Sequence, residues 1–264
     1  MINRSPNILA SLKNLQRHDF FCKDLGCQRS QKDELTPFMV LLKTKLNNGI
    51  KEMLLRRHLS LDVTAKDLKV IYDKQNGKCA LTGLSLKHRE KYKAGDLFTA
   101  SIDRIDSSKG YTKDNIQILN IFMNLAKNNF ADEEMKEFIN DLKTKKDVKY
   151  DYSNLLQSMA NLLYIAKCGR HKDKVNMTSA DLVKLFEIQG GKCAITGLNM
   201  RLGGRKRKPS CKSPYNVSVD RIDNRYGYDC NNIQLVCMAV NYGRSNRSIT
   251  ELNVILNAII SEAQ

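Results

Sequence analysis

One charged, turn-rich segment occurs twice in this chain, and any fold of the chain has to accommodate both copies. Residues 101–119 read SIDRIDSSKGYTKDNIQIL, and residues 218–236 read SVDRIDNRYGYDCNNIQLV. The shared letters are S, D, R, I, D, G, Y, N, I and Q, in that order. Repetition of this kind is the sequence signature of repeated structural units, so the chain is predicted to contain two related halves.

The similarity extends upstream of that segment. GKCALTGL at 77–84 returns as GKCAITGL at 191–198, and RHLSLDVTAKDL at 57–68 returns as RHKDKVNMTSADL at 170–182. Each copy therefore covers roughly a hundred residues, which suits a compact domain and is too long for a solenoid unit. The sequence predicts two fused domains of similar fold.

The expected boundaries follow from where the repeats start and stop. We expect an N-terminal extension over 1–35, a first domain over 36–145 and a second domain over 150–264. The stretch TKKDVKYD at 144–151 is expected to connect the domains.

The local patterns predict helices around short strands in each half. Thr64 with Asp67, and Thr178 with Asp181, have the spacing of a helix N-cap and its acidic third position. ASIDRI alternates like a strand, GYTKDN is typical of a turn, and IQILNIFMNLAKNN passes from a strand into a helix. The expected fold class is α+β and mostly helical.

Charge and composition restrict the partner. The chain of 264 residues has 44 Lys and Arg against 28 Asp and Glu, a formal net charge of +16. Such an excess favours a polyanion, and no apolar run approaches the ~20 residues that span a bilayer. MINRSPNILASLKNLQRHDFF lacks the apolar core of a secretory signal, and eight irregularly spaced Cys fit reduced thiols. We expect an intracellular protein that is not secreted, has no membrane partner and binds nucleic acid.

The central segments carry residues that suit phosphodiester chemistry. Asp103 and Asn124 are 124 − 103 = 21 residues apart, and Asp220 and Asn241 have the same separation, 241 − 220 = 21. A hairpin folded onto a helix can bring each pair together. Asp and Asn offer oxygen ligands, which suit Mg²⁺ completed by water and phosphate oxygens.

Basic residues accompany both pairs. Arg104 and Arg221 stay charged at working pH and so cannot act as bases, but a guanidinium can hold a phosphate and stabilise its developing charge. Lys127 and Arg244 follow the helix Asn by three residues and are expected to point a second cation towards DNA. A basic loop is expected to lie on the DNA backbone and contains Arg205, Lys206, Arg207 and Lys208.

With these residues in place, the chain resembles the HNH (His-Me finger, ββα-metal) endonucleases, in the branch where Asp-His has become Asp-Arg. The pattern D-R-x-D-x-x-x-G-Y-x-x-x-N with a later N-x-x-K runs through DRIDSSKGYTKDN and NLAK, and recurs as DRIDNRYGYDCNN with NYGR. The resemblance implies a tandem duplication of the finger that acts as a monomeric pseudo-dimer, with one Mg²⁺ or Mn²⁺ per domain. It also implies that Asp103, Asn124, Asp220 and Asn241 hold metal and that Asn115 and Asn232 tether the loop.

The chain departs from the family in two respects. Arg104 and Arg221 stand where the family's His activates water, so His58 and His171, at matching places in the repeats, become candidates for the base or for phosphate contact. The paired Cys of the family's structural zinc site are incomplete: Cys79 and Cys193 remain in the turns, and only Cys237 remains at a helix start. This argues against structural zinc.

Two functions remain open at this stage. The first is a metal-dependent DNA endonuclease of restriction or homing type, whose two sites give a double-strand break. The alternative is a non-catalytic or single-site, nicking, sequence-specific DNA-binding protein on a degenerate HNH scaffold.

Overall fold

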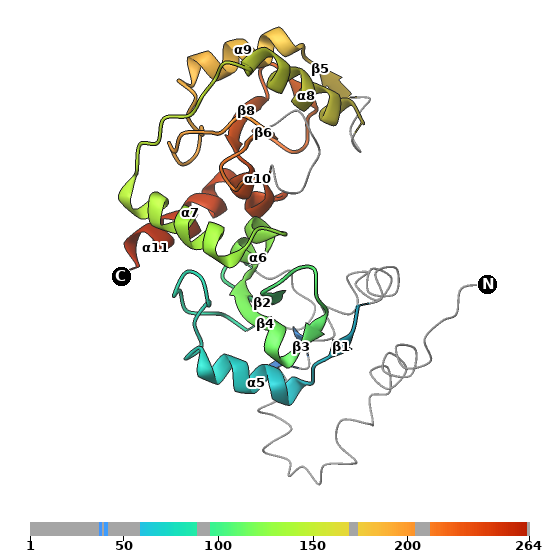
Figure 1. Ribbon diagram of the computed structural model, residues 1–264, viewed down its shortest axis with the longest axis vertical. Coiled ribbons are helices and arrows are strands. Elements are labelled where there is room, and N and C mark those ends of the chain that lie inside the picture. The colour runs from blue at the N-terminus through green and yellow to red at the C-terminus, as the bar shows by residue number, and fades with distance from the viewer. Residues whose placement is uncertain are drawn as a thin grey trace, which may run out of the picture. The chain divides into compact units, whose positions relative to one another are not determined.

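The computed structural model describes residues 37–38, 40–41, 59–88, 96–168, 174–203 and 212–262 (Figure 1). The chain divides into two compact units, Met1–Asn124 and Leu125–Gln264. The division falls inside one helix, α6 (Ile121–Lys127), and therefore does not coincide with the boundaries expected at 145 and 150. The extension expected over 1–35 lies outside the described residues.

The first unit contains two small sheets. Antiparallel strands β2 (Ala100–Arg104) and β4 (Ile116–Asn120) form one sheet, and β4 leads directly into α6. Parallel strands β1 (Leu61–Asp62) and β3 (Tyr111–Thr112) form the other. A 3₁₀ turn, η2 (Lys113–Asn115), joins β3 to β4. The expected order of strand, turn, strand and helix is present.

Helix α5 (Ala65–Lys74) packs on β4 and begins at the expected cap. The Thr64 hydroxyl accepts from the Asp67 amide, and the Asp67 carboxylate accepts from the Thr64 amide, so two otherwise unsatisfied donors are paired. Just beyond the helix, the side-chain amide of Gln75 donates to the Ile118 carbonyl at 2.8 Å and accepts from the Ile118 amide at 3.0 Å. The helix end is thereby joined to the middle of β4.

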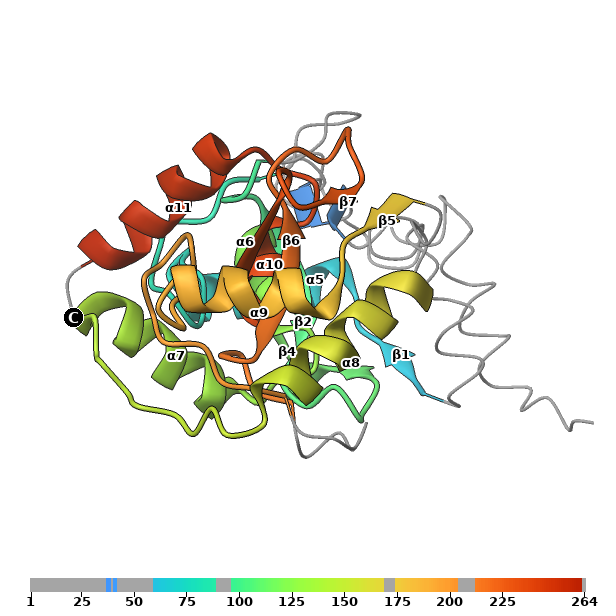
Figure 2. The same cartoon turned by 90° about the horizontal axis from the view of Figure 1, so that it is seen from above.

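The second unit begins with α7 (Asp132–Thr144) and α8 (Leu155–Cys168). Antiparallel β6 (Val217–Arg221) and β8 (Ile233–Cys237) form one sheet, and parallel β5 (Val175–Asn176) and β7 (Tyr228–Asp229) form another. Helix α9 (Ser179–Ile188) lies beside α8 (Figure 2). Helix α10 (Met238–Arg244) follows β8 and packs on β6 and β8, and α11 (Ile249–Ser261) packs on α7.

The helix cap and the glutamine contact of the first unit recur in the second. Thr178 and Asp181 form the expected capping box of α9, and Ser248 and Glu251 form a capping box at α11. Gln189 makes the same pair of bonds as Gln75, donating to the Leu235 carbonyl at 2.8 Å and accepting from its amide at 3.0 Å. Both units combine helices with two-stranded sheets, so the class is mixed α+β.

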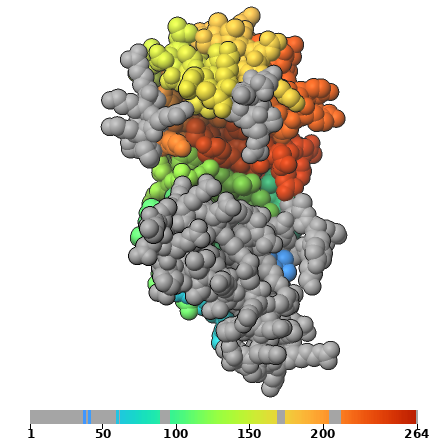
Figure 3. Space-filling view, turned by 90° about the vertical axis from the view of Figure 1, so that its right-hand side faces the viewer, coloured from blue at the N-terminus to red at the C-terminus, as the bar shows by residue number. Residues whose placement is uncertain are grey.

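The surface of the second unit includes much of α8, which the space-filling view shows together with α9 in yellow shades (Figure 3). Leu156, Tyr164 and Ile165 of α8 are exposed, and only Ser158 and Met159 of that helix are buried. Within the described ranges, no helix combines the length and apolar character needed to cross a membrane.

Candidate functional site

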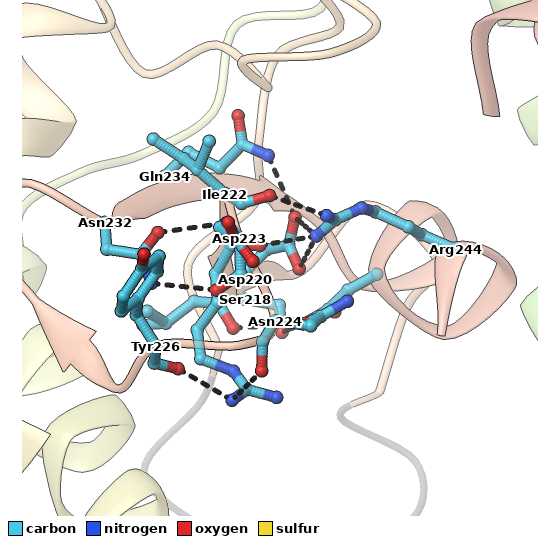
Figure 4. A network of polar contacts seen from close by, with 12 residues as sticks. Ser218, Asp220, Ile222, Asp223, Asn224, Tyr226, Asn232, Gln234 and Arg244 are labelled. Carbon is cyan, nitrogen blue, oxygen red and sulfur yellow. Dashed lines mark hydrogen bonds and ion pairs between the residues drawn. The ribbon is translucent and has the colours of Figure 1, made fainter. Parts of the chain in front are cut away.

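Each candidate Asp lies within its antiparallel sheet, directly opposite a Gln. The register pairs Asp220 with Gln234 and Asp103 with Gln117. Facing residues of an antiparallel pair project to the same face, so the Gln amide reaches the carboxylate. Gln234 Nε2 donates to Asp220 Oδ2 over 2.9 Å (Figure 4), and Gln117 Nε2 donates to Asp103 Oδ2 over 3.1 Å.

In the second unit, Arg244 reaches from α10 into the same place (Figure 4). Its Nη1 lies 2.7 Å from both carboxylate oxygens of Asp220 and donates to the Arg221 carbonyl at 2.6 Å. Its Nη2 donates to the Ile222 carbonyl at 2.8 Å. The side chains are only 2% and 4% exposed, Arg244 and Asp220 respectively, so this is a buried ion pair rather than a surface one.

Asn241 lies one turn before Arg244 on α10 and is fixed against β6. Its Nδ2 donates to Ser218 Oγ at 2.7 Å and to the Val219 carbonyl at 3.1 Å. These two bonds use both amide hydrogens and so determine where the Oδ1 atom lies. Among the described residues, none donates a hydrogen bond to that oxygen, which leaves it available as an acceptor or ligand.

The first unit repeats this anchor. Asn124 Nδ2 donates to Ser101 Oγ at 2.6 Å and to the Ile102 carbonyl at 2.9 Å. No donor to Asn124 Oδ1 occurs in the described part of the chain. The bonded carbonyl belongs to the residue before Asp103, so the helix Asn and the strand Asp are held next to each other.

The Arg of each Asp-Arg pair is engaged with the following loop. Arg104 stacks on Tyr111 with its guanidinium carbon 5.1 Å from the ring centre, and Arg221 stacks on Tyr228 at 5.3 Å. Arg104 Nη1 also donates to the Lys109 carbonyl at 2.9 Å. Both Arg side chains are partly exposed whereas the preceding Asp is buried, as the alternation of side chains along a strand requires.

Asn115 and Asn232 each close that loop with three hydrogen bonds. Asn115 Oδ1 accepts from the Asp106 amide at 2.9 Å, and its Nδ2 donates to the Asp106 and Gly110 carbonyls. Asn232 bonds in the same way to Asp223 and Gly227. These contacts tie the two ends of the loop backbone together in each unit.

Lys127 and Arg244, the two cations that were expected to face DNA from the helices, are buried. Lys127 is 0% exposed, with its Nζ 3.4 Å from Asp132 Oδ1, and Arg244 is 2% exposed. A buried side chain cannot lie on a duplex, so the expectation that Lys127 and Arg244 contact DNA is replaced here by internal ion pairs. Six further candidates lie outside the described residues: His58, His171, Arg205, Lys206, Arg207 and Lys208.

The candidate ligands for a divalent cation are one Asp and one Asn in each unit. Within the described ranges, no three His, Cys, Asp or Glu side chains gather as a metal-binding group, so any site has to be completed by amide oxygens, water or phosphate. In the first unit, Asp103 and Asn124 Oδ1 are oxygen donors of that kind. In the second unit, both oxygens of Asp220 are already bonded to the Arg244 guanidinium, and this pair does not fit a metal.

The three motif cysteines are buried in the two units: Cys79, Cys193 and Cys237. Burial would raise the pKa of Cys193, but hydrogen bonds with Cys237 and Thr196 outweigh it and lower the pKa to about 6. The same contact raises the pKa of Cys237. The absence of structural zinc stays a prediction.

Sequence reasoning missed four polar partners of the site: Ser101, Ser218, Gln117 and Gln234. They bond the candidate Asn and Asp side chains. The sequence contained a signal for these partners, because the Ser and Gln positions are identical in the two central segments. Their role becomes visible only when the strand register is known.

No protein-family model, curated protein or solved structure matches the chain. What the chain does is therefore inferred from its own residues and their geometry.

Proposed function

We propose that this chain is a DNA endonuclease that hydrolyses phosphodiester bonds with Mg²⁺ or Mn²⁺ on a mostly helical, tandemly duplicated ββα-metal (HNH) scaffold, a monomer acting as a pseudo-dimer. One observation carries the proposal. In each unit a helix Asn is tied by two hydrogen bonds to the strand that bears the Asp, with its oxygen left without a described donor. An amide oxygen held in a fixed position next to the Asp strand suits a ligand of a divalent cation.

The first unit supplies the residues for the reaction. Asp103 and Asn124 would hold the metal, which when bound polarises a phosphate oxygen and acidifies water. The anchor on Ser101 and Ile102 fixes Asn124 Oδ1 before the substrate arrives, so little reorganisation is needed. His58 stays the proposed base in this unit, and His171 in the other.

Arg104 is proposed to act by charge alone. Its guanidinium remains protonated, is aligned by the Tyr111 ring and the Lys109 carbonyl, and follows Asp103 directly in the strand. A fixed cation beside a phosphodiester stabilises the negative charge that develops during hydrolysis. The same interactions also order the loop, so its removal is expected to affect both catalysis and stability.

Double-stranded DNA is the proposed substrate because the formal net charge of +16 favours nucleic acid and the central segments resemble those of HNH DNA endonucleases. Phosphate contacts by Lys and Arg supply affinity without reading sequence. The loop with Arg205, Lys206, Arg207 and Lys208 is proposed to make such contacts.

A second candidate, the non-catalytic or nicking protein, is favoured by one observation. The Asp220 carboxylate is bonded on both oxygens to the buried Arg244. A double-strand break by one chain needs a metal in both halves, whereas a nick needs only one competent half.

The test is cleavage of supercoiled plasmid in Mg²⁺ or Mn²⁺ by the intact chain and by Asp103→Asn, Asp220→Asn and the double variant. The proposal expects cleavage by the intact chain and none by the double variant. Asp62→Asn, at an exposed position on β1, is the matched control and should cleave like the intact chain. Plasmid left intact by the unaltered chain across metals and DNA sequences would instead support the non-catalytic binder.

A further inference from the structure

The guanidinium of Arg244 lies where a cation held by Asp220 would lie. Four oxygens surround its two terminal nitrogens at 2.6–2.8 Å: both carboxylate oxygens of Asp220 and the carbonyls of Arg221 and Ile222. Gln234 donates to Asp220 as well. The carboxylate therefore has a full set of partners without any metal.

A divalent cation would have to displace this arrangement. Mg²⁺ requires oxygen ligands at about 2.0–2.1 Å in nearly octahedral geometry, and Asp220 can offer such a ligand only if the Arg244 fork leaves. A departing guanidinium would lose four hydrogen bonds that are buried or partly buried. A guanidinium that stayed would face a like-charged dication at close range in a site with little water to screen it. Both routes disfavour the binding of a divalent cation to Asp220.

We propose that Arg244 acts as a built-in cation that closes the Asp220–Asn241 pair to divalent metal. The second half then holds its β6–α10 junction by an internal ion pair and does not hydrolyse DNA. Resting on the proposed function, this removes the second half as a site of strand cleavage, so that a single chain does not break both strands.

The decisive measurement is the number of Mn²⁺ ions bound, followed by electron paramagnetic resonance of free Mn²⁺ during titration. Asp220→Asn in the intact chain is expected to leave that number unchanged, because Asp220 holds no metal. Arg244→Met is expected to gain one Mn²⁺, and Asp220→Asn/Arg244→Met to lose that gain. Arg247→Met, which removes one partly exposed Arg three residues away, is the control and should gain none.

Loss of one bound Mn²⁺ in Asp220→Asn would overturn the inference. That comparison needs no Arg244 variant, so it decides the question even if Arg244→Met does not fold. An intact chain that binds no Mn²⁺ would contradict the proposed nuclease while supporting closure of Asp220. Conversely, linear plasmid produced in a single binding event, together with an Mn²⁺ lost in Asp220→Asn, would sustain the nuclease and reject the closed second half.

Discussion

Arg244 Nη1 lies 2.7 Å from each carboxylate oxygen of Asp220, and both side chains are almost fully buried. Removing one partner leaves an uncompensated charge inside the protein. We expect Arg244→Met to lower the free energy of unfolding by about 3–5 kcal/mol, because a buried ion pair is costly to break from one side. Urea unfolding followed by circular dichroism measures the change.

The double variant Asp220→Asn/Arg244→Met is the matched control for that prediction. With both charges gone, most of the lost stability should return, since neutral replacement of a buried pair is often nearly neutral in energy. A double variant as unstable as Arg244→Met would mean that packing of the Arg stem, and not its charge, accounts for the loss.

A side chain at Gly110 or Gly227 is expected to destabilise the protein. A Cβ at Gly110 would lie 2.4 Å from the Ser60 carbonyl oxygen, and one at Gly227 would lie 2.5 Å from that of Lys174. Each clash falls on backbone next to the short parallel pairs, which has to shift. We expect either Gly→Ala change to cost roughly 1–3 kcal/mol, as measured by thermal or urea unfolding.

Gly203→Ala serves as the control, because the nearest atom to its added Cβ is 4.0 Å away. Its effect should stay within about 0.5 kcal/mol, as for other changes that create no clash. Equal losses at Gly110 and Gly203 would show that the close backbone approach is not the cause.

Asn232→Ala should open the loop that follows Arg221. The change removes three hydrogen bonds to the backbone of Asp223 and Gly227. Leaving these groups unpaired is expected to cost about 1–3 kcal/mol in unfolding free energy. Hydrogen exchange of the Asp223 amide should accelerate in parallel. Asn231→Ala, at an exposed neighbour, should leave that amide protected.

Stability should fall in acid as capping and loop carboxylates become protonated. A hydrogen bond from the Thr178 hydroxyl lowers the pKa of Asp181, and the Arg225 side chain lowers that of Asp223 to about 2. A carboxylate whose pKa is depressed by folding stabilises the protein above its unfolded pKa, near 3.9, and loses that effect as the pH falls through its folded pKa. The urea midpoint should therefore decrease from about pH 4 towards pH 2. A midpoint independent of pH in that window would contradict the assignment.

Much of the local structure follows from short sequence patterns. The caps at Thr64 and Thr178 and the strand around Asp103 depend on residues within a few positions of one another, and each lies where its pattern predicts. The inward direction of Arg244 could not be predicted in this way. A seven-residue helix can present either face to a sheet, and that choice depends on how β6, β8 and α10 pack.

The candidate site shows the same limit. The constant spacing of 21 residues predicted that the helix Asn approaches the Asp strand, and both units have that approach. The Gln partners depend on the strand register, and the orientation of Arg104 towards Tyr111 depends on alternation along β2. Register and facing are set by long-range pairing, which residue spacing alone does not determine.

The amides of Gln75 and Gln189 have a consequence for how the chain behaves at high concentration. Each offers one donor and one acceptor to a single residue of β4 or β8, as a neighbouring strand would. A two-stranded sheet otherwise exposes unpaired backbone that can recruit another molecule. By imitating an additional strand, each glutamine pairs the backbone amide and carbonyl of one residue of β4 or β8, so those two groups are not available for intermolecular β-pairing.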